Sequence, residues 1–165
     1  MVSDATAAPG KDAFNTGVVN LGFISSGVWT IQVAIERLNA YLNGEPIRVG
    51  SESNISDALL VTGFQAPEWN SDSAVLEQIG NLIGKSRSVR IFGAASLDLC
   101  MVATGQLTGF FHDGLHPWDD AAGVIILQEA GGTVTNREGE SFRLSDDTLV
   151  ASNQLIHDSL IVLLN

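Results

Sequence analysis

The chain has little cysteine, little positive charge and no long apolar run. Its single cysteine, Cys100, excludes a disulfide framework and a cysteine-based metal site. Eight Lys and Arg against 19 Asp and Glu leave a net charge of −11, without the basic footprint that nucleic-acid binding needs. No apolar stretch reaches the roughly 18 residues of a membrane span, and the N-terminus lacks the pattern of a secretory signal. We therefore expect a cytoplasmic protein that acts on small molecules or cations, with neither nucleic acid nor a membrane as partner.

The sequence is rich in hydrophobic residues. Of its 165 residues, 45% are hydrophobic and only 16% are charged, which excludes a disordered chain and predicts one domain or slightly more. Residues 1–16 are small and polar without periodicity, so they are predicted to form a flexible tail.

Residues 17–55 carry the signals of antiparallel strands. An apolar run over 18–24 predicts one strand, and the alternation from Trp29 to Val33 predicts a second with one buried face. Asn43-Gly44 between apolar residues predicts a tight hairpin, because both residues accept positive φ. We interpret 17–55 as the remnant of an N-terminal antiparallel-sheet subdomain.

Residues 56–165 alternate between strand and helix signals, which predicts a C-terminal α/β subdomain. Strands are expected at 58–61, 89–92, 109–112 and 149–151, the first two of them buried. Helices are expected at 75–83, with Ser71, Asp72 or Ser73 as cap, and at 96–104, 119–130 and 155–164.

Two stretches concentrate the residues suited to chemistry. In His116-Pro117-Trp118-Asp119, the aspartate falls at or next to a helix N-cap, and a capping aspartate beside a core tryptophan explains this stretch without any function. The second stretch, Gly93-Ala94-Ala95-Ser96, joins a strand to a helix, where free backbone N–H groups suit an oxyanion. Here Ser96 as a simple helix cap is the alternative.

Together with Leu42–Ile47 and Glu129-Ala130-Gly131-Gly132, these stretches resemble the inositol monophosphatase family of Mg²⁺-dependent phosphatases. The resemblance runs from about Gly17 to the C-terminus. It implies a layered αβαβα sandwich of the sugar-phosphatase type, N-terminally incomplete. It also implies hydrolysis of a small polyol or sugar phosphate such as inositol phosphate, and a possible homodimer.

The resemblance also assigns residues. Asp119 matches a catalytic aspartate that binds Mg²⁺ and contacts the substrate, and Gly93, Ala94 and Ala95 match a turn that lies along the substrate. His112 stands where many members have a glutamate that binds the polyol.

Three alternatives remain open for that histidine position: a different substrate, replacement by Asp113, or a degraded site. Asp120 adds an acid beside the expected metal ligand.

The family's other metal ligands come from an upstream glutamate and an Asp-Pro-(Ile or Leu)-Asp-Gly-Thr loop. Before Gly17 the only acids are Asp4 and Asp12, and neither stands in such a loop. One carboxylate binds Mg²⁺ weakly, so we expect the chain alone to be impaired as an enzyme. The alternative is a non-catalytic truncated relative or an interaction module.

A zinc site is a further hypothesis. His112 and His116 are four residues apart, a spacing that places two ligands on one helix face. Gly114 and Pro117 argue against a helix through them.

The remaining candidates favour structural roles. Cys100 is expected to be a buried apolar residue, and Asp98 to serve the helix dipole or support the site. His157 is expected on the surface or in helix packing, and Trp29 and Trp69 as core or rim anchors.

Overall fold

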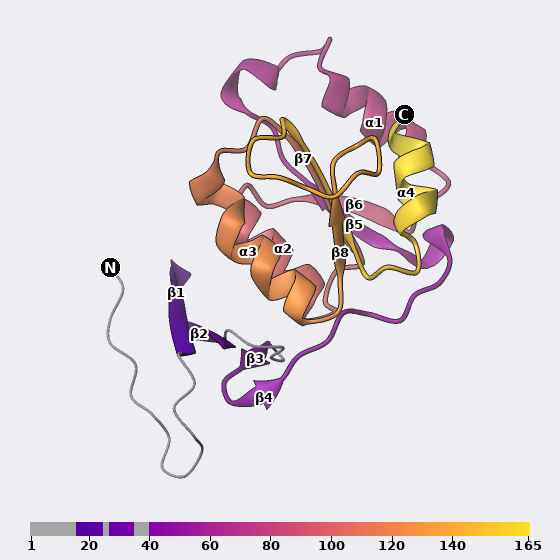
Figure 1. Ribbon diagram of the computed structural model, residues 1–165. Coiled ribbons are helices and arrows are strands. Elements are labelled where there is room, and N and C mark those ends of the chain that lie inside the picture. Colours follow the sequence, from indigo (N-terminus) through magenta and orange to yellow (C-terminus); the bar gives the residue numbers. More distant parts are fainter. Residues whose placement is uncertain (1–15, 25–26, 35–39) are drawn as a thin grey trace.

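A computed structural model describes residues 16–24, 27–34 and 40–165, which form two β-sheets and four α-helices (Figure 1). The predicted tail lies outside the described residues, except for Thr16, which begins the first strand. Within the described ranges, no helix has the length and apolar character needed to cross a membrane.

The smaller sheet has the strand order β1-β2-β3-β4. Strands β1 (Thr16–Ile24) and β2 (Gly27–Ala34) pair antiparallel, which confirms the two strands predicted there. Strands β3 (Tyr41–Leu42) and β4 (Glu45–Pro46) form the predicted hairpin. Its turn has φ of 53° at Asn43 and 88° at Gly44, so both residues occupy the left-handed region that this turn requires.

The larger sheet has the strand order β6-β5-β7-β9-β8. Strand β5 (Leu59–Thr62) lies parallel to β6 (Ser88–Ile91) and β7 (Gly109–Asp113). Strand β9 (Thr148–Ser152) runs antiparallel to β7 and β8 (Thr133–Thr135). The three-residue strand β8 was not predicted, because it is too short to show an alternating pattern.

The prediction of a buried strand at 89–92 was wrong about its burial. Strand β6 is the edge of the described sheet, and Ile91 and Phe92 are 48% and 50% exposed. An apolar run shows that a segment suits a strand, but whether a neighbour covers it depends on the tertiary arrangement.

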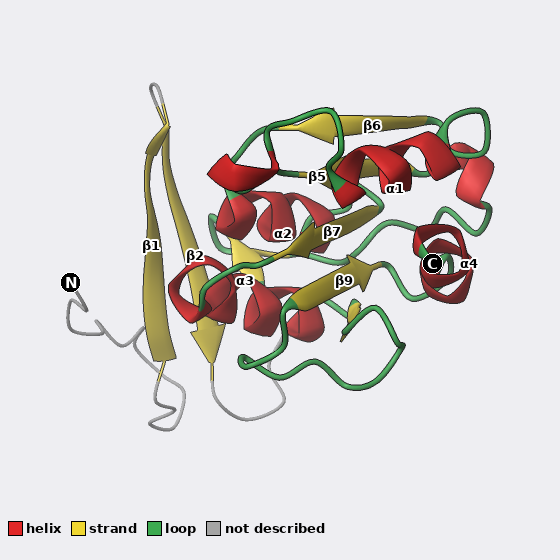
Figure 2. Cartoon of the chain, turned by 90° about the horizontal axis from the view of Figure 1, so that it is seen from above, coloured by secondary structure: helices red, strands yellow, loops and turns green. Residues whose placement is uncertain are grey.

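The helices lie on both faces of the larger sheet (Figures 1 and 2). Helices α1 (Ala74–Leu82) and α4 (His157–Leu164) cover one face, and α2 (Ala95–Ala103) and α3 (Pro117–Glu129) cover the other. Because α2 and α3 also separate the two sheets, the described residues form the layers α–β–α–β. Ser73 caps α1, as predicted, by accepting a hydrogen bond from the Val75 N–H at 3.3 Å.

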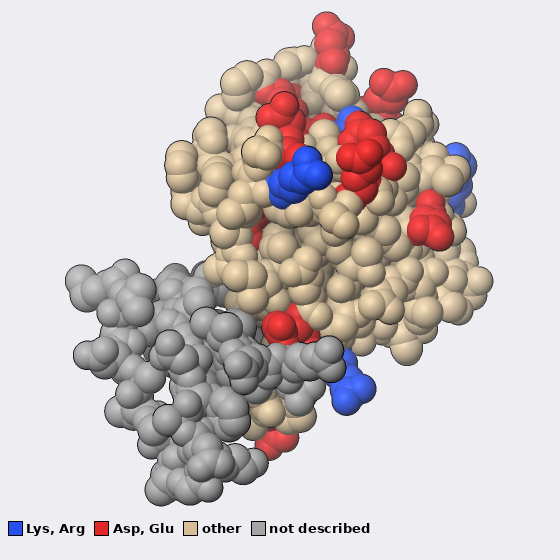
Figure 3. Space-filling view, viewed as in Figure 1, with Lys and Arg blue, Asp and Glu red and all other residues tan. Residues whose placement is uncertain are grey.

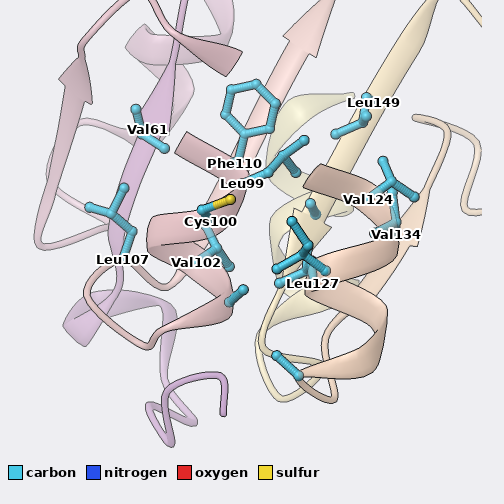
Figure 4. Close-up of a cluster of buried hydrophobic side chains, with 14 of the residues drawn as sticks. Val61, Leu99, Cys100, Val102, Leu107, Phe110, Val124, Leu127, Val134 and Leu149 are labelled. Atoms are coloured by element: carbon cyan, nitrogen blue, oxygen red, sulfur yellow. The ribbon is translucent and has the colours of Figure 1, made fainter. Parts of the chain in front are cut away.

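Alternating side chains of the larger sheet supply two hydrophobic cores. On β7, Phe110 packs with Val61 and Leu127 on the α2–α3 side, whereas Phe111 packs with Leu60 on the α1–α4 side. Figure 4 shows the first core, in which Cys100 lies among aliphatic side chains. Cys100 is 4% exposed, and its burial raises the thiol pKa to about 12, so it behaves as the apolar residue that was expected.

The expectation of a core tryptophan at residue 118 was wrong, since Trp118 is 78% exposed. Trp69 is 74% exposed and contacts the ring of Phe64 edge to face, which leaves the rim position of its two expected ones. Trp118 instead stacks on His116, with ring centroids 4.5 Å apart. His157 is not on the surface: it is 5% exposed and its two ring nitrogens contact hydroxyl groups. The side chain of Trp29 lies outside the described residues.

Candidate active site

A cavity of about 200 Å³ opens where β5, β6 and β7 end at their carboxyl termini. Loops that follow parallel strands meet at the same edge of a sheet, where α/β proteins commonly bind ligands. The cavity is lined by Gly63, Phe64, Gln65, Gly93, Ala94, Ala95, Asp98, His112, Leu115 and Asp119.

The cavity brings together the five site residues that the sequence singled out: Gly93, Ala94, Ala95, His112 and Asp119. They come from three segments that are distant in the chain: the β6–α2 turn, the end of β7 and the start of α3. Their chemical roles remain predictions.

The β6–α2 turn places backbone N–H groups at the cavity. Gly93 has φ of 74°, a conformation that a residue with a side chain adopts only with strain. Ala94 is the N-cap of α2 and has no side chain able to cap it, so the first N–H groups of the helix remain open to an anion.

Ser96 does not cap α2. Its hydroxyl donates a hydrogen bond to the backbone carbonyl of Asp119, which ties the start of α2 to the start of α3. The serine therefore fixes the β6–α2 turn relative to the start of α3, which carries Asp119.

Asp119 is the third residue of α3 and has a structural role. Its Oδ2 accepts a hydrogen bond from the His116 N–H at 3.1 Å, which is one half of a capping box. The cap engages one carboxylate oxygen and leaves Oδ1 for a ligand. Asp119 therefore caps helix α3 and also lines the cavity.

His112 is 7% exposed and fixed in its ring orientation. Its Nδ1 lies 2.7 Å from the backbone carbonyl of Asp113, which can only accept, so Nδ1 carries the proton and Nε2 is the acceptor of the neutral ring. Nε2 packs against Gly63, where a Cβ would lie only 2.7 Å away. An acceptor at Nε2 preserves one property of the glutamate that the resemblance leads us to expect at this position.

Asp113 and Asp120 do not line the cavity. Asp113 forms an ion pair with Arg137 and accepts a hydrogen bond from Gln78 at 3.2 Å. Asp120 is 3% exposed; burial and then the charge of Asp119 raise its carboxyl pKa. The geometry thus gives no support to the alternative in which Asp113 replaces the substrate-binding glutamate.

The sequence reasoning missed Asp98 as a cavity residue. It is 1% exposed, and burial raises its carboxyl pKa to about 7, although a hydrogen bond with the Ala94 backbone opposes this shift. A signal for its location was available, because Asp98 follows Ala95 by three residues and therefore shares its helix face. Gly63 was also missed, although it directly follows a buried parallel strand.

The described residues fit one ligand of a Mg²⁺ site rather than a complete set. Asp119 supplies a hard carboxylate oxygen of the kind Mg²⁺ prefers. Across residues 16–24, 27–34 and 40–165, no three His, Cys, Asp or Glu side chains gather closely enough to hold a metal. For zinc, His112 lies in β7 and His116 caps α3, so the helix face that the zinc hypothesis requires does not exist.

Comparison with known proteins identifies the family of the chain. The family model described as the inositol monophosphatase family matches residues 14–164. A Neisseria meningitidis protein named putative Nus factor SuhB is 41% identical over 123 residues, 74% of this chain and 47% of its own. An inositol monophosphatase of Mesembryanthemum crystallinum is 36% identical over 129 residues, 77% of this chain and 48% of its own.

Among solved structures, the inositol monophosphatase from Anabaena (Nostoc) sp. PCC 7120 superimposes with a TM-score of 0.77 at 33% identity. The superposition covers 90% of this chain and 57% of that one. This chain therefore spans about half the length of the curated relatives it matches. With the fold and the family match in agreement, the chain belongs to the inositol monophosphatase family.

Proposed function

We propose that the cavity is the substrate-binding part of a Mg²⁺-dependent phosphomonoesterase that hydrolyses a small polyol or sugar phosphate such as inositol phosphate. The observation that carries this proposal is the meeting of an uncapped helix N-terminus with a carboxylate in one cavity. The first group suits a phosphate and the second suits a cation or a hydroxyl.

In this proposal each group of cavity residues binds a different part of the substrate or the metal. Backbone N–H groups at Ala94 and Ala95 bind phosphate oxygens, and Nε2 of His112 accepts a hydrogen bond from a substrate hydroxyl. Asp119 holds Mg²⁺ through its carboxylate, and its cap on the His116 N–H keeps it in place. Bound Mg²⁺ would supply charge neutralisation and an activated water.

We further propose that this chain alone turns over substrate poorly. Support comes from the described lining of the cavity, in which Asp119 is the one residue that the resemblance assigns as a metal ligand, because phosphoryl transfer depends on several ligands holding the metal.

The test is Mg²⁺-dependent phosphate release from a panel of polyol, sugar and nucleoside monophosphates. We expect little turnover by this chain, and clear turnover by a chimera that adds the unmatched part of the Neisseria relative. Asp119→Asn should then abolish most of the chimera's activity, whereas Val162→Ala on the exposed face of α4 should not. Equal turnover by the Asp119→Asn chimera would contradict the proposal.

A non-catalytic interaction module is the second candidate. One observation favours it: a relative that is 41% identical has a name that states no phosphatase activity. A chimera that binds phosphate esters in the cavity but never hydrolyses them would support this candidate over the enzyme.

A further inference from the structure

Asp98 is a buried acid that the packing of the fold does not explain. It is 1% exposed on α2 between Leu97 and Leu99, and its Oδ1 has no hydrogen-bond partner in the part of the chain that the structure describes. A buried polar oxygen without a partner destabilises the folded state, so an apolar residue would suit this position better. An unexplained polar group of this kind points to a ligand or a functional constraint.

The cavity supplies the place for such a ligand. Asp98 lines it together with the Gly93–Ala95 turn and Asp119. The Ala94 backbone lies close to the same carboxyl group and lowers its pKa. Oδ1 is buried without a partner among the described residues, so it becomes available to a bound molecule when the side chain turns toward the cavity.

The chemistry of Oδ1 determines which group of a ligand it can bind. An ionised carboxylate repels phosphate oxygens, which the N–H groups of the α2 N-terminus attract instead. A hydroxyl both donates and accepts, so it suits Asp98 in either protonation state. We infer that Asp98 is a specificity-determining residue whose Oδ1 binds a hydroxyl group of the polyol part of a phosphate ester. This inference rests on the proposed function and adds a contact to it.

Two ligands of matched shape test the inference: glycerol 2-phosphate and isopropyl phosphate, which differ only in two hydroxyl groups. Their dissociation constants are measured by NMR titration in the presence of Mg²⁺, with inorganic phosphate as a third probe. Wild-type protein should prefer glycerol 2-phosphate. Asp98→Leu should reduce that preference about tenfold, the loss expected for one hydrogen bond to a carboxyl group.

Two further variants separate recognition from folding. Asp98→Asn should keep most of the preference, because an amide still forms a hydrogen bond with a hydroxyl. Asp120→Leu is the matched control: Asp120 is also buried with an unpaired Oδ1, but it lies outside the cavity. Both leucine variants should raise the melting temperature, and only Asp98→Leu should change the preference.

The outcomes distinguish the two proposals. If wild type binds the esters with equal affinity, or Asp98→Leu and Asp120→Leu alter the preference equally, the role of Asp98 is overturned while phosphate binding stands. If wild type binds neither the esters nor inorganic phosphate, the proposed function fails and the inference fails with it.

Discussion

At the scale of single residues, the position of His112 in the cavity depends on the absence of a side chain at Gly63. Gly63 is buried, and a Cβ there would lie 2.7 Å from Nε2 and 2.9 Å from Cδ2 of His112. The imidazole can keep its present orientation only because residue 63 has no side chain. Gly63 is therefore a positioning residue for His112.

We predict that Gly63→Ala displaces His112 and weakens binding of glycerol 2-phosphate, with a loss of roughly 1–3 kcal/mol in stability from overpacking. NMR titration and chemical denaturation measure the two effects. The matched control is Gly80→Ala, since Gly80 lies in α1 with nothing within 4 Å of an added Cβ. That variant should gain about 0.5–1 kcal/mol and bind normally. Normal binding by Gly63→Ala would contradict the positioning role.

His157 links three elements through its ring. Nε2 contacts the Thr135 hydroxyl and Nδ1 contacts the Ser152 hydroxyl, each at 2.9 Å. Burial lowers the pKa of the ring, an effect that the nearby charge of Asp158 partly offsets. The folded state therefore favours the neutral ring.

We predict that protonation of His157 destabilises the fold. Because its folded pKa is below the ordinary 6.5, its stabilising contribution is complete above pH 6.5 and declines as the pH falls from there toward the folded pKa. Urea denaturation at several pH values measures this. In His157→Gln that part of the pH dependence should vanish, and an unchanged pH profile in the variant would refute the assignment.

At the scale of elements, α2 and α3 pack closely where Gly123 meets Leu99. Gly123 makes this possible, since a Cβ there would lie 2.7 Å from Cδ1 and 2.8 Å from Cβ of Leu99. The small residues Ala121-Ala122-Gly123 allow such a close approach. The same packing holds Ser96 against the start of α3, so it also shapes the cavity.

We predict that Gly123→Ala forces the two helices apart and costs roughly 1–3 kcal/mol of unfolding free energy. A double-mutant cycle by chemical denaturation tests the cause. In a Leu99→Gly background the new methyl group has space, because all the Leu99 side-chain atoms that it would contact are removed, so Gly123→Ala should cost less there than in wild type. Additive effects would show that the helices do not meet at this pair.

The molecule as a whole presents an acidic surface and an open sheet edge. On the face drawn in Figure 3, Lys and Arg side chains occur singly among acidic ones, in line with the net charge of −11. Strand β6 ends the described larger sheet, beside the exposed side chains of Ile91 and Phe92. An open edge with exposed apolar side chains favours pairing with another chain.

We propose that two copies of this chain associate through β6, and we predict concentration-dependent dimer formation in sedimentation experiments. Ile91→Lys places a charge on the edge and should shift the protein toward monomer. The control is Val162→Lys, which is 74% exposed and lies on helix α4 rather than on the edge strand. A monomeric wild type, or equal loss of dimer in both variants, would contradict this contact.

Local patterns in the sequence were sufficient to predict most elements. Asn43-Gly44 specified its hairpin and Ser73 its helix start, because turns and caps depend on only a few neighbouring residues. The resemblance singled out Gly93, His112 and Asp119, which line one cavity. Division into subdomains 17–55 and 56–165 remains a proposal.

Only the tertiary structure decided which side chains are covered. It buried His157, exposed Trp118, and left β6 at an edge, since burial depends on neighbours that are distant in the chain. It also brought Gly63 and Asp98 into the cavity, because parallel strands place the loops that follow them at one sheet edge. The sequence determined the elements and the reactive groups, whereas chain packing determined which of those groups share a site.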